Sequence, residues 1–298
     1  MAAVGFSAVT VALTLLLIWS NKSVFLDYGF TLPVLILILL THFSVAGSAL
    51  LLPFAIQIPV KLETLGRNLA VSFRGQMANF GLPNGVGSAL RAKRLGVSYS
   101  PTQTFTFLLI ERFWSVLLWS LLGLVLLAVS WGGTESSHFE YFLISILIAS
   151  ALISFGLSSR LGVAFSKTIL ASLPQRFVKS LYAGKLFESI PHDRRNLTTA
   201  RLSGSLLVTI GVFSLLFLGT YYDTSSVTGL LISRAIAVAI SSIPLPLPNI
   251  VTRELGFYAT GLAVGLGQEL LGAVIAVFLI GQMSTALTGL LFEISSAM

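Results

Sequence analysis

The chain contains several apolar runs that are long enough to cross a lipid bilayer, and no other feature constrains its fold as much. A helix of about 20 apolar residues spans the roughly 30 Å of bilayer hydrocarbon. Hydrophobic residues make up 55% of the 298 residues and charged residues only 10%. These charges are too few to cover the surface of a water-soluble domain of this length. The sequence therefore predicts an all-α integral membrane protein.

The apolar runs predict about six full transmembrane helices. The first run has no basic segment before it and no small-residue cleavage site after it, so we expect a retained helix rather than a signal peptide. The predicted helices cover about residues 2–19, 30–58, 102–130, 140–158, 202–220 and 266–292.

The tripeptide Leu-Pro-Asn occurs twice, at 82–84 and at 247–249, and charged residues follow it each time. Proline removes a backbone donor and interrupts a helix. An irregular backbone at membrane depth is tolerated only inside protein or beside a watery cavity. We therefore expect two broken re-entrant helical hairpins, at about residues 69–96 and 227–265.

Basic residues indicate which loops face the cytoplasm. Fourteen of the 18 Lys and Arg residues lie in two connecting regions, 61–94 and 160–201, whereas the links 131–140 and 221–226 carry acidic residues and no basic one. Cytoplasmic loops are rich in Lys and Arg. This rule predicts a multi-pass protein of a bacterial or archaeal plasma membrane, with both termini and the loop 160–201 in the cytoplasm.

With this topology the two hairpins enter the membrane from opposite sides. Residues 30–158 and 202–298 then form an inverted-topology repeat within a single polytopic domain, 1–298. Many transporters build a site near the bilayer midplane from such a repeat. The connector 160–201 is expected to form a basic amphipathic helix on the anionic inner leaflet, or alternatively a solvated linker.

Composition excludes several classes of site and partner. There is no cysteine, so the chain has no disulfide and no thiolate site. The three histidines, at positions 42, 138 and 192, show no ligand spacing. We expect no metal and no cofactor. The net charge of +7 follows from the cytoplasmic loops, so we expect no nucleic-acid partner.

The first hairpin offers a candidate anion site. Asn84 can cap a new helix, whose free N–H groups and positive dipole end attract an anion. Arg91 lies on that helix and would add a guanidinium suited to phosphate. The alternative is an interfacial turn from which Arg91, Lys93 and Arg94 reach into the cytoplasm.

The second hairpin supplies similar groups. Asn249 follows Pro248, and Arg253 and Glu254 come directly after it. We expect Asn249 to begin a helix as Asn84 does, and Arg253 and Glu254 to be candidate substrate-binding residues.

Charged residues inside the predicted spans are further candidates. Glu111, Arg112 and Arg234 lie well inside apolar segments, where each charge costs roughly 2.5–3.5 kcal/mol and therefore faces a partner or a cavity. Glu111 and Arg112 point about 100° apart on one helix, so each should bond another element. They either contact substrate or lock their helix to a hairpin. Arg74 is the remaining candidate, at the base of the first hairpin.

Three segments resemble the transmembrane region of the lysylphosphatidylglycerol synthase family, the flippase-like part of the multiple peptide resistance factor. They are LPNGVGSALRAKRLGVS (82–98), LLIERFWSVLL (108–118) and PLPNIVTRELG (246–256), in the order and spacing of the family. The chain departs from the family at Gly87–Ser88, where Gly-Glu is common, and at Pro248–Ile250, where a glycine-rich turn is usual. The resemblance implies a stand-alone member that translocates lipid and lacks the soluble synthase domain.

The leading hypothesis is a lipid flippase without covalent chemistry, whose partners are membrane lipids with an anionic headgroup. The lipid is an aminoacylated phospholipid or a polyprenyl- or glycan-linked lipid. Association of the chain into a homo-oligomer is left as an open alternative. One alternative is an integral-membrane enzyme acting on a lipid phosphate or a lipid-linked sugar, but the chain shows no catalytic cluster. The other is a non-catalytic membrane partner protein.

Overall fold

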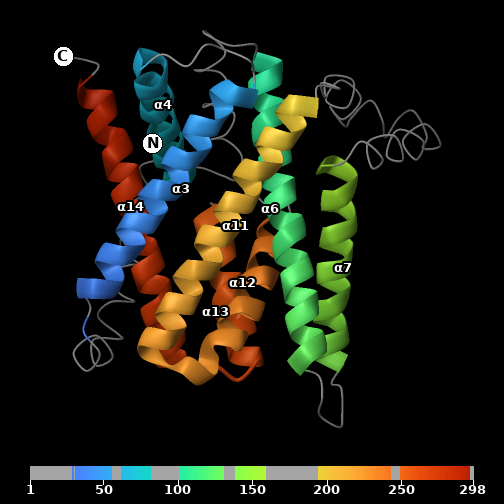
Figure 1. Ribbon diagram of the computed structural model, residues 1–298. Coiled ribbons are helices and arrows are strands. Elements are labelled where there is room, and N and C mark those ends of the chain that lie inside the picture. Colours follow the sequence, from blue (N-terminus) through green and yellow to red (C-terminus); the bar gives the residue numbers. More distant parts are fainter. Residues whose placement is uncertain are drawn as a thin grey trace.

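A computed structural model describes residues 29, 31–55, 62–81, 101–130, 138–158, 194–242 and 249–295. Every regular element within these residues is helical, and none of them forms a strand (Figure 1). The elements are α3 (Thr31–Ala55), α4 (Leu62–Gly81), α6 (Pro101–Ser130), α7 (His138–Ser158), α11 (Arg194–Tyr222), the 3-10 helix η1 (Thr224–Ser226), α12 (Val227–Ser241), α13 (Asn249–Ala263) and α14 (Gln268–Ser295).

Six helical segments of the described residues are long and apolar enough to cross a membrane. Five of them, in α3, α6, α7, α11 and α14, correspond to predicted transmembrane helices. The sixth is Thr224–Ser241, which the sequence assigned to the first arm of a hairpin. The predicted helix 2–19 lies outside the described residues. The protein is therefore an all-α, multi-pass membrane protein, as predicted.

The long helices form a bundle in which successive helices run in opposite directions. The C-terminal ends of α3, α7 and α14 and the N-terminal end of α11 lie at one end of the bundle (Figure 1). The link between α11 and α12 lies at the other end. The side of the membrane that each end faces stays a prediction.

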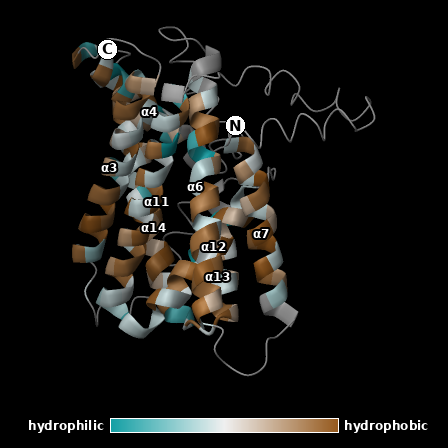
Figure 2. Cartoon of the chain, turned by 45° about the vertical axis from the view of Figure 1, so that its right-hand side comes forward, coloured by the Kyte–Doolittle hydropathy of each residue, from teal (hydrophilic) through white to brown (hydrophobic). Residues whose placement is uncertain are grey.

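Helix α12 lies at the centre of the bundle. Every residue from 230 to 237 is buried, and so is every residue from 271 to 279 of α14. A helix that is apolar around its whole circumference needs neighbours on all sides, and α12 packs against α6, α7, α11 and α13. The outer helices instead expose large apolar side chains such as Leu39 and Leu152, and Figure 2 shows the hydrophobic colour over most of α3, α6 and α7. These faces are suited to lipid.

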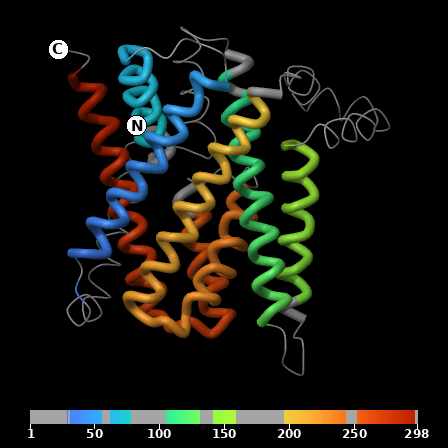
Figure 3. Tube along the Cα trace, in the orientation of Figure 1, coloured from blue at the N-terminus to red at the C-terminus, as the bar shows by residue number. Residues whose placement is uncertain are grey.

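Helices α12 and α13 form an antiparallel pair between α11 and α14 (Figure 3). Each has 15 residues and is about 22 Å long, whereas the 28 residues of α14 span about 42 Å. The pair starts and finishes at the same end of the bundle (Figure 3). This geometry is compatible with a hairpin over 227–265, and its re-entrant path through a membrane stays a prediction.

Helix α4 covers the first part of the predicted hairpin, which was expected at about residues 69–96. The helix is regular from Leu62 to Gly81 and ends directly before Leu82, where the sequence predicts the break. Glycine permits a break without requiring one, and packing supports this helix along α14. A Cβ atom at Gly289 of α14 would collide with the backbone of Phe73, so the two helices approach at a glycine. Residues 82–96, the rest of the predicted hairpin, lie outside the described residues.

The predicted connector 160–201 is also shorter than expected. Its last eight residues belong to α11, which begins at Arg194. The remainder lies outside the described residues, and so does the predicted amphipathic helix.

Candidate functional site

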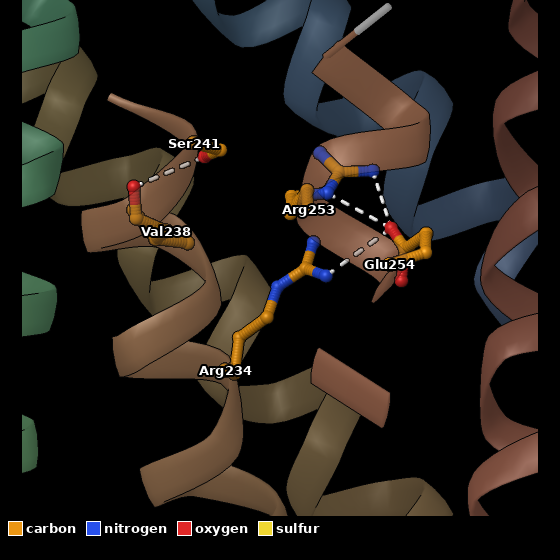
Figure 4. A network of polar contacts seen from close by, with 5 residues as sticks. All are labelled: Arg234, Val238, Ser241, Arg253 and Glu254. Atoms are coloured by element: carbon orange, nitrogen blue, oxygen red, sulfur yellow. Dashed lines mark hydrogen bonds and ion pairs between the residues drawn. The ribbon is translucent and has the colours of Figure 1, made fainter. Parts of the chain in front are cut away.

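Arg234, Arg253 and Glu254 form a cluster between α12 and α13 (Figure 4). The Glu254 Oε1 atom accepts a hydrogen bond from Arg253 Nε at 2.8 Å and lies 2.7 Å from Arg253 Nη2. Arg234 Nη1 approaches the same oxygen from α12 at 3.4 Å. The chain brings these residues together because α13 runs back along α12, so residues 20 positions apart face each other.

The cluster is largely buried and carries more positive than negative charge. Arg234 is 9% exposed and Glu254 is 6% exposed, whereas the Arg253 side chain is 17% exposed. Two guanidinium groups face one carboxylate, so these three side chains carry a net charge of +1. The Arg234 guanidinium also lies over the ring of Phe278, with Cζ 4.9 Å from the ring centroid. A cation over an aromatic face is stabilised by about 0.5–2 kcal/mol, which offsets part of the cost of burying this arginine.

The cluster lies a little more than a third of the way along α14 from its N-terminal end. Arg234 comes ten residues after Thr224, and Phe278 comes ten residues after Gln268. At about 1.5 Å per residue both lie about 15 Å from the end of the bundle where η1 begins.

Three other arginines bind the ends of helices. Each donates a hydrogen bond to a backbone carbonyl in the last turn of a neighbouring helix, where carbonyls lack a partner within the helix and the helix dipole is negative. These pairs are Arg74 with Phe292 of α14, Arg112 with Ser241 of α12 at 3.2 Å, and Arg201 with Ser158 of α7 at 2.9 Å. Such contacts have a structural explanation, whereas Arg234 and Arg253 bind no helix end through any contact found in the described part of the chain.

Glu111 and Arg112 bond different neighbours, which confirms the prediction made from their angular separation. The Ser48 hydroxyl of α3 lies 2.8 and 2.9 Å from the two carboxylate oxygens of Glu111. Arg112 reaches Ser241 on α12. Glu111 and Arg112 thus join α6 to α3 and α12, which is the helix-locking alternative; contact with substrate stays a prediction.

Arg74 is not part of the cluster. Its Nε atom lies 2.9 Å from the Glu293 carboxylate near the end of α14. The side chains of Arg74 and Glu293 are 17% and 41% exposed, so this is a partly solvated ion pair. Arg74 is thus bound near the end of α14, away from Arg234 and Arg253, and its contact with substrate stays a prediction.

The structure covers the predicted site only in part. Asn84 and Arg91 lie outside the described residues. The backbone of Asn249 begins α13, as predicted for the second break. Arg234, Arg253 and Glu254 are brought together, and Arg112 bonds the end of the helix that carries Arg234.

Sequence reasoning missed several partners of these charges. Ser48, Phe278 and the carbonyl of Ser241 belong to residue types that are common inside any membrane helix, so no signal marks them. The pairing of Arg234 with Glu254 had a usable signal, because a predicted hairpin over 227–265 places its two arms side by side.

The chain was compared with protein-family models, curated proteins and solved structures, and none of them matched.

Proposed function

We propose that the protein is a lipid transporter that moves an anionic or headgroup-modified lipid between the two leaflets without covalent chemistry. The observation that carries this proposal is the buried cluster of Arg234, Arg253 and Glu254, with its excess positive charge. A charge near the centre of a bilayer costs roughly 2.5–3.5 kcal/mol and usually marks a pathway for a polar or charged substrate. An anionic ligand would neutralise the excess charge.

The depth of the cluster supports a translocation site. If the η1 end of the bundle lies at the membrane surface, a position about 15 Å along the helices is near the middle of a hydrocarbon core of about 30 Å. Transporter sites at the midplane are often built from discontinuous helices. The short pair α12 and α13 fits this pattern, since it carries all three charged residues of the cluster.

The arginines are suited to a phosphate. A guanidinium presents about five N–H donors in a planar fork, and it binds phosphate oxygens in pairs. Arg234 directs only Nη1 toward Glu254, and Arg253 directs Nε and Nη2, so the remaining donors can bind a headgroup. The lipid tails would stay in the bilayer.

Movement of the α12–α13 pair would alternate access to the cluster. Among the described helices, α13 packs mainly against α12 and less extensively against α14 and α4, which supports a shift of α13 together with α12. Arg112 holds the Ser241 end of α12 and would set the position of the pair. The resemblance to the flippase-like region of lysylphosphatidylglycerol synthases supports the same class of activity.

The test is a leaflet-resolved flipping assay in proteoliposomes with fluorescent anionic and aminoacylated phospholipids. Arg253→Gln removes the excess charge but leaves Glu254 paired with Arg234. Glu293→Gln is the matched control, because it removes a charge from a partly solvated pair away from the cluster. We expect Arg253→Gln to slow flipping at least about tenfold, the effect of losing about 1.4 kcal/mol, and Glu293→Gln to leave it near the wild-type rate.

Equal rates for Arg253→Gln and wild type would remove the cluster from the transport path. No movement of any phospholipid by the wild type would refute phospholipid transport and would direct attention to polyprenyl-linked lipids.

A further inference from the structure

Only one of the two carboxylate oxygens of Glu254 contacts Arg234 and Arg253. Every contact from Arg234 and Arg253 converges on the Oε1 atom. The Oε2 atom is buried and has no hydrogen-bond partner among the described residues, and no dashed line reaches it in Figure 4. An ionised carboxylate can accept about four hydrogen bonds through its two oxygens. This site therefore leaves an acceptor open.

The Ser241 hydroxyl does not fill this position. Figure 4 shows it turned toward the Val238 carbonyl of its own helix, to which it donates a hydrogen bond at 3.0 Å. A buried charged acceptor without a donor is costly, because it has given up hydrogen bonds to water without replacing them. An external donor at Oε2 would remove this cost.

We propose that Glu254 Oε2 accepts a hydrogen bond from a hydroxyl or ammonium group of the lipid headgroup whose phosphate lies on Arg234 and Arg253. The proposal rests on the proposed function, and it adds a requirement that the arginines alone do not impose. The preferred ligand is a phosphodiester lipid with a hydrogen-bond donor a few atoms from the phosphate. Glu254 is then a specificity residue, which distinguishes headgroups of the same charge.

Charge supports a phosphodiester. The two guanidiniums and one carboxylate leave one positive charge, which a singly charged phosphodiester neutralises. A phosphate monoester that carries two negative charges would leave one of them uncompensated among these three side chains. The location between α12 and α13, inside a bundle with apolar outer faces, favours a lipid over a soluble phosphate ester.

The test compares lipids of the same charge that differ in whether the headgroup carries a hydrogen-bond donor. Phosphatidylglycerol and phosphatidylmethanol carry the same charge, but only the first has headgroup hydroxyls. Phosphatidylethanolamine and phosphatidylcholine are both zwitterionic, but only the first has N–H donors. Binding of each lipid, with identical acyl chains, to the detergent-solubilised full-length protein is measured by native mass spectrometry.

We expect the donor-bearing lipid of each pair to bind about tenfold more tightly, the effect of one hydrogen bond to a charged group. In Glu254→Gln the preference should fall to about threefold or less, whereas Glu293→Gln should keep it. The comparison of donor-bearing and donor-free lipids on the wild-type protein tests the proposal even if Glu254→Gln fails to fold. An excess of glycerophosphoglycerol, the soluble phosphodiester that lacks the acyl chains of phosphatidylglycerol, should not displace that lipid; displacement would show that the site takes a soluble ester and would overturn the assignment to a lipid.

Equal binding within both wild-type pairs would overturn the proposal, even if the flipping assay succeeds. Donor-dependent binding without any flipping would refute transport but support the role of Glu254 in lipid recognition. The two assays therefore separate a failure of this inference from a failure of the proposed function.

Discussion

Glu254→Gln should destabilise the protein far more than Arg234→Met, although the two residues form the same ion pair. Glu254 is the carboxylate shared by the buried Arg234 and the partly buried Arg253. Its loss leaves both arginines without this counter charge. The loss of Arg234 leaves Glu254 paired with Arg253 at 2.7 Å, and the methionine retains an apolar side chain beside Phe278.

The distances between the arginine nitrogens and Glu254 Oε1 give the size of the difference in stability between the two variants. With an effective dielectric constant of about 20, the attraction between unit charges is about 5 kcal/mol at the 3.4 Å between Arg234 and Glu254, and about 6 kcal/mol at the 2.7 Å between Arg253 and Glu254. Glu254→Gln loses both attractions, and breaking a buried pair in this way typically costs about 3–5 kcal/mol net. Arg234→Met loses one attraction but also removes the repulsion between the arginines, so we expect a cost within about 1.5 kcal/mol.

The free energy of unfolding is measured in mixed micelles of dodecyl maltoside and SDS for the wild type and each variant. Glu293→Gln provides the control, because its side chain is 41% exposed and exposed ion pairs contribute about 0–1 kcal/mol. A cost for Arg234→Met equal to or greater than that for Glu254→Gln would refute the account of the cluster as two cations sharing one anion.

Two further predictions concern the links at the η1 end of the bundle. Gly265 has a φ of +85° and open space around it, whereas Gly267 has open space without a positive φ; Gly265→Ala should therefore cost about 1–2 kcal/mol and Gly267→Ala much less, and equal unfolding free energies in the same micelles would contradict this. Hydrogen bonds from the Ser226 and Ser225 side chains, and then from the Ser225 backbone N–H, lower the pKa of the Asp223 carboxyl below its ordinary value of 3.8. A lowered folded-state pKa stabilises the protein above the ordinary value, and this contribution is lost as the pH falls through the folded pKa. The difference in melting temperature between wild type and Asp223→Asn should accordingly be constant from pH 7 to about pH 5 and become smaller below pH 3.8. A melting-temperature difference that changes between pH 7 and pH 5 would show that the Asp223 carboxylate is not its source.

Apolar length alone was enough to predict the architecture. The segments in α3, α6, α7, α11 and α14 that can span a membrane follow from runs of about 20 apolar residues, because a backbone in hydrocarbon must satisfy its hydrogen bonds within a helix. Helix α4 continues through Gly66 and Gly75, because glycine weakens a helix by only about 1 kcal/mol and α4 packs along α14. The predicted break at 82–84 lies outside the described residues.

The sequence also determined that certain charges need partners, but it could not say which partners. Arg74, Arg112, Arg201, Arg234 and Arg253 carry the same guanidinium group. The first three bind helix ends and the last two share a carboxylate. Only the tertiary structure makes this distinction, because the acceptors are carbonyls and a carboxylate brought close by helix packing. The partner of Arg74 lies 218 residues away along the chain and that of Arg112 lies 129 residues away, and no local pattern encodes such a contact.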